Sequence, residues 1–305
     1  MENKELVKEI EKLKKEKNAI ILAHNYQVPE IQDIADIVGD SLKLSQEAAK
    51  TKADIIVLAG VSFMAESCKI LSPIKKVLLP VKDAGCPMAD MIDVERLKEF
   101  KKKHKDCSVV CYVNSSAEVK GESDICCTSS NAFKIVNSLD TKKVLFIPDK
   151  NLGTYIKNNV KDKEVIPYKG FCVTHNRINM EEVDNMLEKH KDALLLAHPE
   201  CDNKVLEKAH FIGSTSAIIN YAKESNNKKF IIATEIGVMH KLKNDNKHTN
   251  KEFYLLSDSL VCSNMKKTKL NDIYNCLKNE EFEIILEENI RLKAKKSLDK
   301  MLELS

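Results

Sequence analysis

Three cysteines stand in loops of similar character, and their type and spacing suggest metal chemistry. Cys86 lies in residues 83–90 (DAGCPMAD), Cys172 ends residues 168–172 (YKGFC), and Cys262 follows Val261 in residues 261–265 (VCSNM). The three positions are 86 and 90 residues apart. Cysteine thiolates are the usual protein ligands of iron–sulfur clusters. We predict that these three thiolates meet in space and hold one cluster.

The remaining cysteine usage narrows the kind of metal site. The chain has ten cysteines, and no two of them form a Cys-x-x-Cys pair. This spacing excludes the zinc ribbon, the thioredoxin motif and the ferredoxin-type run of ligands. Three thiolates leave one iron of a four-iron cluster without a protein ligand, and such an open iron acts as a Lewis acid that assists loss of water.

Each cysteine loop closes a stretch in which strands and helices alternate. The apolar run at residues 19–23 is bounded by polar residues and fits a buried strand of a parallel sheet. Further strands of this first unit are predicted at residues 54–59 and 77–81. The equivalent strands are predicted at 107–111, 143–147 and 164–167 in a second unit, and at 193–197, 229–233 and 253–256 in a third.

Three features recur in phase along the chain. The first strands end at Ala23, Cys111 and Ala197, and Ser41, Ser129 and Thr215 each follow 18 residues later. One of the three cysteines then closes each unit. We therefore predict an α/β protein of three pseudo-threefold-related, three-layer αβα domains with parallel sheets, forming a trefoil around a central cluster. The predicted domains are residues 18–105, 106–191 and 192–278.

The two ends of the chain are predicted to be helices that pack on these domains. Residues 1–17 show apolar residues at helical spacing, and residues 279–305 are predicted to form a helix that returns across another unit. The Asn- and Lys-rich residues 240–251 are predicted to form a mobile surface insertion.

Ligands of α/β proteins bind beyond the carboxyl ends of the strands, so the side chains there are the candidates for chemistry. Those with hydrogen-bonding and acid–base capacity are His24, Tyr26, Tyr112, Asn114, His198 and Glu200, and His175 is a further candidate. Ser41, Ser129 and Thr215 are each predicted to open a helix, and helix N-termini attract anions. Around one cavity, they suit a substrate with several carboxylates or a phosphate.

The charge balance excludes other classes of protein. The 49 basic and 46 acidic residues nearly cancel, which argues against a partner such as nucleic acid or a membrane surface. No apolar run reaches the length of a membrane span, and the charged N-terminal stretch lacks the apolar segment of a signal peptide. We expect a cytoplasmic protein whose cysteines are reduced.

A series of short motifs also resembles the quinolinate synthase family, the iron–sulfur enzymes of bacterial and archaeal NAD biosynthesis. They are residues 23–27 (AHNYQ), 39–41 (GDS), 84–89 (AGCPMA), 111–115 (CYVNS), 126–129 (CCTS), 170–172 (GFC), 198–201 (HPEC), 213–215 (GST) and 262–266 (CSNMK). The chain departs from the family pattern at Tyr168, where a Trp is expected, and at Ser263, where a Pro is expected.

The resemblance implies a transferase that condenses iminosuccinate (iminoaspartate) with dihydroxyacetone phosphate, giving quinolinate, phosphate and water. It implies a [4Fe-4S] cluster on Cys86, Cys172 and Cys262, whose open iron helps to expel hydroxide. It also implies that an aspartate oxidase or dehydrogenase supplies the iminosuccinate.

The resemblance further implies roles for particular residues. Tyr26, His198 and Glu200 would handle proton transfers. The residues that would bind substrate carboxylate and phosphate groups are His24, Ser41, Tyr112, Val113, Asn114, Ser129, His198, Pro199, Glu200, Ser214 and Thr215.

Other readings stay open at this point. The diphosphate-reducing terminal enzyme of the non-mevalonate isoprenoid pathway and the diphthamide-forming proteins also look like three α/β units with one cysteine each. A non-catalytic iron–sulfur sensor would keep a cluster but form no product. A structural zinc protein is less favoured, because no cysteines here have compact ligand spacing.

Overall fold

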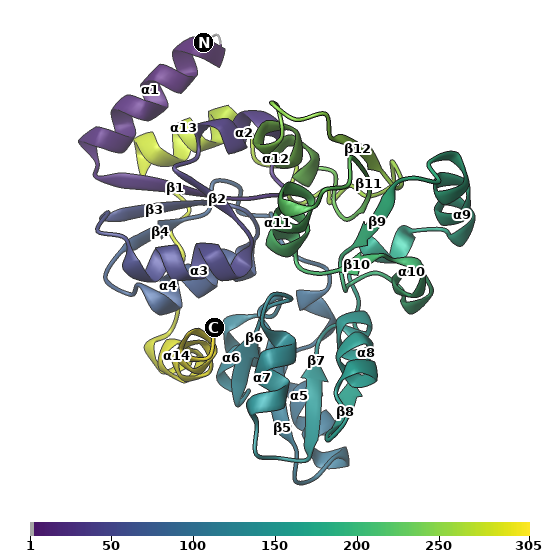
Figure 1. The fold of residues 1–305 in the computed structure, drawn as a ribbon. Coiled ribbons are helices and arrows are strands. Elements are labelled where there is room, and N and C mark those ends of the chain that lie inside the picture. The colour runs from purple at the N-terminus through teal and green to yellow at the C-terminus, as the bar shows by residue number, and fades with distance from the viewer. Residues whose placement is uncertain (1–2) are drawn as a thin grey trace.

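The computed structural model describes residues 3–305, which form three parallel four-stranded sheets flanked by helices (Figure 1). The strand orders are β2-β1-β3-β4, β6-β5-β7-β8 and β10-β9-β11-β12, so the three sheets share one topology. This confirms the predicted α/β class with three similar parallel units. The third unit contains β9 (Leu194–Ala197), β10 (Phe211–Ile212), β11 (Lys229–Ala233) and β12 (Glu252–Leu255), with α10 (Asn203–Lys208), α11 (Thr215–Glu224) and α12 (Val238–Asp245).

The first and second units are built in the same way. The first contains β1 (Ala19–His24), α2 (Pro29–Ile34), β2 (Ile37–Gly39), α3 (Ser41–Lys50), β3 (Ile55–Ala59), α4 (Ser62–Leu71) and β4 (Lys76–Leu78). The second contains β5 (Ser108–Tyr112), α6 (Ala117–Gly121), β6 (Ile125–Cys127), α7 (Ala132–Ser138), β7 (Lys143–Ile147), α8 (Lys150–Asn159) and β8 (Glu164–Pro167).

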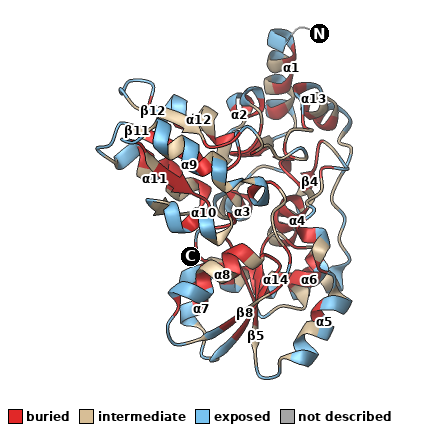
Figure 2. Ribbon diagram, turned by 90° about the vertical axis from the view of Figure 1, so that its right-hand side faces the viewer, coloured by how far each residue is buried: buried red, intermediate tan, exposed pale blue. Residues whose placement is uncertain are grey.

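The central strands are buried because helices cover both faces of each sheet. All five residues of β3 are buried, and β1 pairs with it in parallel from Ala19 opposite Ile55 to Ala23 opposite Ala59. Figure 2 shows the buried residues concentrated along the strands and on the inward faces of the helices. A continuous apolar run is the expected sequence of such a strand.

The second strand along the chain in each unit, which lies at the edge of its sheet, was not predicted. In the first unit, α2 ends at Ile34 and residues 37–39 form β2. Likewise β6 and β10 are edge strands of three and two residues. Segments this short contain no full period of apolar residues, so their strand character comes from pairing with the neighbouring strand.

The helix that follows each cysteine loop packs on the next unit rather than on its own. These helices are α5 (Val94–Lys103), α9 (Met180–Lys189) and α13 (Leu270–Asn279). The rings of Phe100 on α5 and Tyr168 of the second unit pack in a T-shaped arrangement, with their centroids 5.3 Å apart. Val183 of α9 lies in the core of the third unit. Helix α13 falls at the end of the predicted range 192–278, but it packs in the core of the first unit.

The packing of α13 closes the three units into a ring. Its residues Ile273 and Leu277 share a core with Ile10 of α1 (Asn3–Glu16) and with Val57 of β3. Figure 1 shows α13 beside α1, although the two helices lie at opposite ends of the sequence. The first sheet is therefore covered on one side by the two terminal regions of the chain.

This contact leads to a prediction for stability. Replacing Ile273 with alanine is expected to reduce the free energy of unfolding by about 2–5 kcal/mol, because the side chain is fully buried and a cavity would remain. Denaturant titration measures the loss. The matched variant Ile285→Ala should change little, since that side chain is 75% exposed. Equal stability of the two variants would contradict the ring closure by α13.

The tail is helical over a shorter range than predicted. Helix α14 spans Glu288–Glu303, whereas a helix was expected from residue 279. Residues 282–284 instead run along β4, where Ile284 N–H donates to Val77 O at 2.8 Å. This pairing satisfies backbone groups of the sheet edge. Helix α14 crosses to the second unit, as predicted, and its Ser297 Oγ donates to Lys120 O of α6 at 2.9 Å.

The expected mobile insertion at residues 240–251 is wrong for its first half. Helix α12 extends to Asp245, and its Leu242 is fully buried in the third unit. Polar residues on the outer face of this helix hid its apolar inner face in the sequence.

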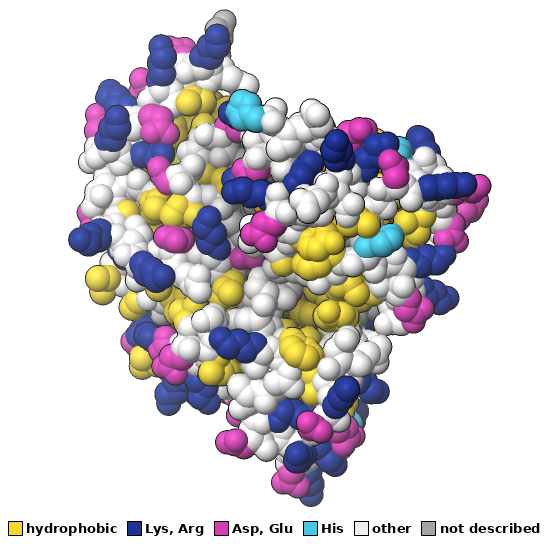
Figure 3. All heavy atoms as spheres, in the orientation of Figure 1, with side chains coloured by type: hydrophobic (Ala, Val, Ile, Leu, Met, Phe, Trp, Pro, Cys, Tyr) yellow, Lys and Arg dark blue, Asp and Glu magenta, His cyan; other side chains and the backbone are white. Residues whose placement is uncertain are grey.

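The surface carries both charges. On the face in Figure 3, basic and acidic side chains are interspersed, in line with the small net charge of +3. Within residues 3–305, no helix is both long enough and apolar enough to cross a membrane.

Candidate functional site

The three cysteine loops converge on one cavity between the units. Cys86, Cys172 and Cys262 all line it, and all three are free thiols. The same backbone hydrogen bond ties each loop to its sheet. A backbone N–H three residues after β3, β7 or β11 donates to the carbonyl two residues before the cysteine. The three pairs are Ser62 to Ala84 at 2.8 Å, Lys150 to Gly170 at 2.6 Å, and Ile236 to Leu260 at 2.9 Å.

Two buried carboxylates fix the second and third loops further. Cys172 N–H donates to Asp149 Oδ2 at 3.2 Å, and Cys262 N–H donates to Glu235 Oε1 at 3.1 Å. Lys266 Nζ lies 2.8 Å from the same Glu235 oxygen. Neither acid was predicted from the sequence, although each stands two residues after the second long strand of its unit. They hold the cysteine backbones and leave the thiols facing the cavity.

The thiols lie close enough to influence each other's ionisation. Burial raises the pKa of the Cys86 thiol to about 12, and negative charge at Glu200 and Cys262 raises it as well. Burial and Glu200 likewise raise the pKa of Cys172 well above its usual range, and Cys86 contributes. Three neighbouring thiols that ionise unfavourably in isolation fit a site for a cationic metal group, which stabilises thiolates.

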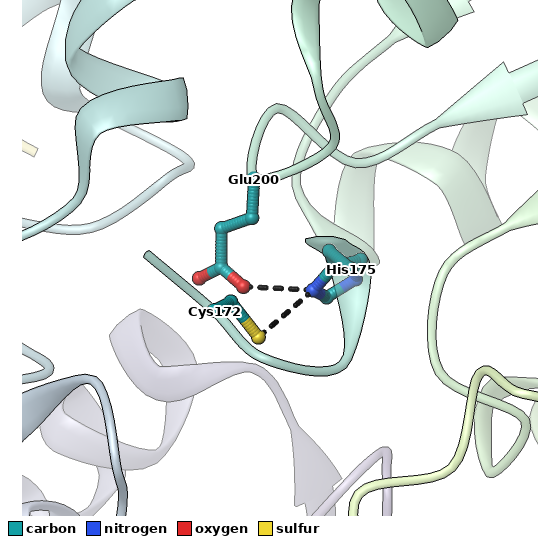
Figure 4. A group of neighbouring side chains, drawn as sticks. All are labelled: Cys172, His175 and Glu200. Atoms are coloured by element: carbon teal, nitrogen blue, oxygen red, sulfur yellow. Dashed lines mark hydrogen bonds and ion pairs between the residues drawn. The ribbon is translucent and has the colours of Figure 1, made fainter. Parts of the chain in front are cut away.

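A chain of buried hydrogen bonds runs alongside the thiols. Tyr26 Oη lies 2.7 Å from Thr234 Oγ1, and Thr234 Oγ1 lies 3.0 Å from His175 Nε2. The other imidazole nitrogen of His175 is 2.9 Å from Glu200 Oε2 (Figure 4). This chain gives the Tyr26 phenol a proton path to a carboxylate through a histidine. His175 was a candidate from the sequence, but Thr234 was not.

Glu200 is the charged centre of this cluster. Burial alone would raise the pKa of Glu200, but His198, His175 and the Tyr112 hydroxyl together hold it well below its usual range. Tyr112 Oη donates to Glu200 Oε1 at 2.5 Å. Burial and the Glu200 charge raise the pKa of Tyr112 and of Tyr26 well above the usual value, so both phenols are protonated in the resting site.

Two histidines at equivalent strand ends have the same local geometry. Tyr26 N–H donates to His24 Nδ1 at 3.1 Å, and Glu200 N–H donates to His198 Nδ1 at 3.3 Å. Because each Nδ1 is an acceptor, each neutral ring carries its proton on Nε2. Burial lowers the pKa of His24 to about 4 and that of His198 to about 3. Both rings are therefore neutral N–H donors near neutral pH.

The structure brings most of the predicted site residues to this one cavity. Those that line it are His24, Tyr26, Ser41, Cys86, Tyr112, Asn114, Ser129, Cys172, His198, Glu200, Thr215 and Cys262. Val113, Pro199 and Ser214 do not line it. Ser214 instead caps α11, where its Oγ accepts from Ala217 N–H at 3.3 Å.

The expectation that all three Ser/Thr residues open helices is wrong for Ser129. Ser41 and Thr215 are the first residues of α3 and α11, but α7 begins only at Ala132. A turn forms first, because Asn131 Oδ1 accepts from Thr128 N–H at 2.7 Å. Ser129 still faces the cavity from this turn, and its Oγ lies 3.2 Å from His198 Nε2.

Polar contacts that were not predicted from the sequence also join the units at the cavity. Asp40 precedes Ser41, and its Oδ2 accepts from Ser130 Oγ at 3.0 Å, linking the first and second units. Thr215 Oγ1 lies 2.9 Å from Tyr26 Oη, linking the third and first. Contacts between units that are distant in sequence left no signal in the sequence itself.

Gly237 provides a test of how the chain places Tyr26. A Cβ at this position would lie 2.6 Å from the Tyr26 backbone, so Gly237→Ala must displace the tyrosine. We expect kcat of the reaction proposed below to fall at least about 10-fold, as positioning of a proton-transfer group is lost. The matched variant Gly121→Ala comes no closer than 3.1 Å to another residue, the Lys293 side chain, lies outside the cavity and should retain activity. Equal activity of the two variants would contradict this packing.

The fold and the cavity together define a class: a three-unit α/β protein whose cysteine loops surround a site with a buried acid–base chain. A sequence model of the quinolinate synthetase A protein family matches residues 8–303. The chain is 63% identical to quinolinate synthase of Alkaliphilus metalliredigens over 304 residues, covering 100% of both chains. It is 57% identical to that of Clostridium kluyveri over 297 residues, covering 97% of both, and 52% identical to that of Caldicellulosiruptor saccharolyticus over 305 residues, covering 100% of both. The chain belongs to the quinolinate synthase family, which confirms the resemblance seen in its motifs.

Proposed function

We propose that this protein condenses iminosuccinate with dihydroxyacetone phosphate to give quinolinate, phosphate and water, a step of NAD biosynthesis. The observation that carries the proposal is the hydrogen-bond chain from Tyr26 to Glu200 beside three converging thiols, in a chain similar over its full length to proteins named quinolinate synthase. Ring formation from these substrates requires repeated proton transfers and loss of water, and such a chain supplies both acid and base.

We further propose that Cys86, Cys172 and Cys262 hold a [4Fe-4S] cluster. The three free thiols on one cavity, two of them on backbones fixed by buried carboxylates, support this assignment. When bound, such a cluster would supply an open iron that acts as a Lewis acid and favours departure of hydroxide.

The polar lining of the cavity suits substrates with carboxylate and phosphate groups. His24 and His198 present neutral Nε2–H donors, and Ser41 and Thr215 stand at helix N-termini, where free N–H groups favour anions. Asn114 lines the cavity with its buried Oδ1 unpartnered among residues 3–305, which leaves this acceptor to a hydroxyl or N–H group of a ligand. In this proposal the donors hold the substrate anions, and one face of the substrate points toward Tyr26.

Tyr26 is the proposed proton-transfer group. Its hydroxyl is protonated at rest and can give its proton to a leaving oxygen or recover one through Thr234 and His175. Glu200 stabilises the positive charge that develops on His175 during this transfer. Tyr112 lies on the opposite side of Glu200 and fixes the carboxylate by its hydrogen bond.

The substrate chemistry also implies a partner activity. An imine is hydrolysed readily in water, so a supply of iminosuccinate close to its use is expected. We propose that an aspartate oxidase or dehydrogenase supplies it.

The proposal is tested by assaying cluster-loaded protein without oxygen. Quinolinate and inorganic phosphate are expected in equal amounts, and only when iminosuccinate and dihydroxyacetone phosphate are both present. Chromatography measures the quinolinate, and a colorimetric assay measures the phosphate. A loaded protein that forms neither would refute the proposal and favour the reductase or sensor alternatives.

A further inference from the structure

Three different metal-ligating groups meet at one point beside the cysteine loops. His175 Nδ1 lies 3.2 Å from Cys172 Sγ and 2.9 Å from Glu200 Oε2. One ligand atom from each of the three residues lies within 4.8 Å of the other two. Figure 4 shows the thiol, the imidazole and the carboxylate directed toward one another. Two of these residues belong to the second cysteine loop and the third follows β9.

These distances are close to those of a tetrahedral site for a borderline-soft divalent ion. Zinc binds thiolate at about 2.3 Å, imidazole nitrogen at about 2.0–2.1 Å and carboxylate oxygen at about 2.0–2.2 Å. In a tetrahedron, such bonds place neighbouring ligand atoms about 3.3–3.7 Å apart. The separations of 2.9 and 3.2 Å therefore need to widen by only a few tenths of an ångström.

We propose that, in the chain without an iron–sulfur cluster, Cys172, His175 and Glu200 bind one zinc-like divalent cation, with a fourth position open to the cavity. This inference rests on the proposed function only in assigning Cys172 to both sites. Binding releases one proton, that of the Cys172 thiol. Glu200 binds as the carboxylate, and neutral His175 carries its proton on Nε2 toward Thr234 Oγ1, leaving the Nδ1 lone pair for the metal.

The surroundings favour a cation at this point. The side chains of His175 and Glu200 are 1% and 5% exposed, so the charge of the carboxylate is poorly solvated. Asp149 Oδ2 accepts from the Cys172 N–H, and burial together with the Glu200 charge raises the pKa of this carboxyl group well above its usual range, so Glu200 supplies the negative charge at this point. A divalent ion compensates the buried negative charge of Glu200, which otherwise has only hydrogen-bonding partners.

The shared cysteine makes the ion and the cluster mutually exclusive. An ion at this site occupies Cys172, one of the three proposed cluster ligands. It also occupies His175 and Glu200, which form one end of the proposed proton path. The ion-bound chain can therefore neither take up the cluster nor relay protons, whereas a cluster-loaded chain no longer offers the thiolate to zinc.

The test is an anaerobic titration of the cluster-free, full-length chain with Co²⁺, a spectroscopic probe for tetrahedral zinc sites. We expect one Co²⁺ per chain, a thiolate-to-cobalt charge-transfer band, and displacement by Zn²⁺. His175→Ala should weaken Co²⁺ binding by more than the roughly 10–100-fold that loss of an outer-shell partner costs. Glu200→Gln should also weaken it, and Cys172→Ser should remove the thiolate band.

The matched controls are Cys86→Ala and Cys262→Ala, which should keep the band and the affinity. The opposite pattern, loss of the band in Cys86→Ala or Cys262→Ala with none in His175→Ala, would show an ion held by the three cysteines and would overturn the inference. Absence of Co²⁺ binding by the wild-type chain would overturn it as well. Neither result bears on quinolinate formation by cluster-loaded protein, so failure of the proposed function is observed separately.

Discussion

Loss of both the cluster and the activity is expected when any one of Cys86, Cys172 and Cys262 is replaced with alanine. The three thiols line one cavity from three different units, so the two that remain cannot take the place of the missing ligand. Iron and sulfide should fall to background, and quinolinate formation should fall with them. Elemental analysis of anaerobically reconstituted protein and chromatographic detection of quinolinate measure the two losses.

Cys107→Ala is the matched control for these variants. Cys107 lies just before β5 and does not line the cavity, and its Sγ donates to Lys105 O at 3.4 Å. This variant should retain iron, sulfide and activity at the level of the unaltered protein. Loss of the cluster in Cys107→Ala equal to that in Cys172→Ala would contradict the ligand assignment.

Replacing Glu200 with glutamine should leave the cluster in place but remove most of the turnover. The amide has nearly the same shape but no charge, so it cannot stabilise a protonated His175 across the 2.9 Å contact. Loss of this acid–base path is expected to lower kcat by about 10²–10⁴-fold. Steady-state assays on protein with a measured iron content separate this effect from cluster loss.

Glu224→Gln is the control for the glutamine substitution, because Glu224 lies on the exposed end of α11. Its kcat should equal that of the unaltered protein. Full activity of Glu200→Gln at unchanged iron content would remove Glu200 from the proton path. A parallel fall of iron and activity would instead assign it a role in holding the metal.

The sequence predicted the repeating part of the fold, because that part is encoded locally. The long strands are continuous apolar runs, and the phase between Ala23, Cys111 and Ala197 showed three units before any contact was known. The exchange of helices between units could not be predicted in this way. An apolar face such as that of α13 indicates that the helix is buried on that side, but it does not indicate which sheet covers it.

The same distinction separates the site residues that were predicted from the sequence from those that were not. Residues at strand ends, such as His24 and Glu200, were found because every parallel sheet places ligand contacts there. Thr234 and Asp149 were missed, since their importance comes from partners that lie far away in the sequence. Ser129 lies in a turn because the Asn131 side chain accepts a local hydrogen bond that competes with the helix. The spacing of Ser129 from the strand did not reveal this bond.

The most direct test of the account is quinolinate formation by anaerobically purified protein whose iron is counted in the same sample. The account predicts about four irons per chain and quinolinate from iminosuccinate and dihydroxyacetone phosphate, in proportion to the iron content. Protein that retains about four irons but forms no quinolinate would contradict the proposed reaction. Protein that takes up no iron even after reconstitution would contradict the three-cysteine site on which the account depends.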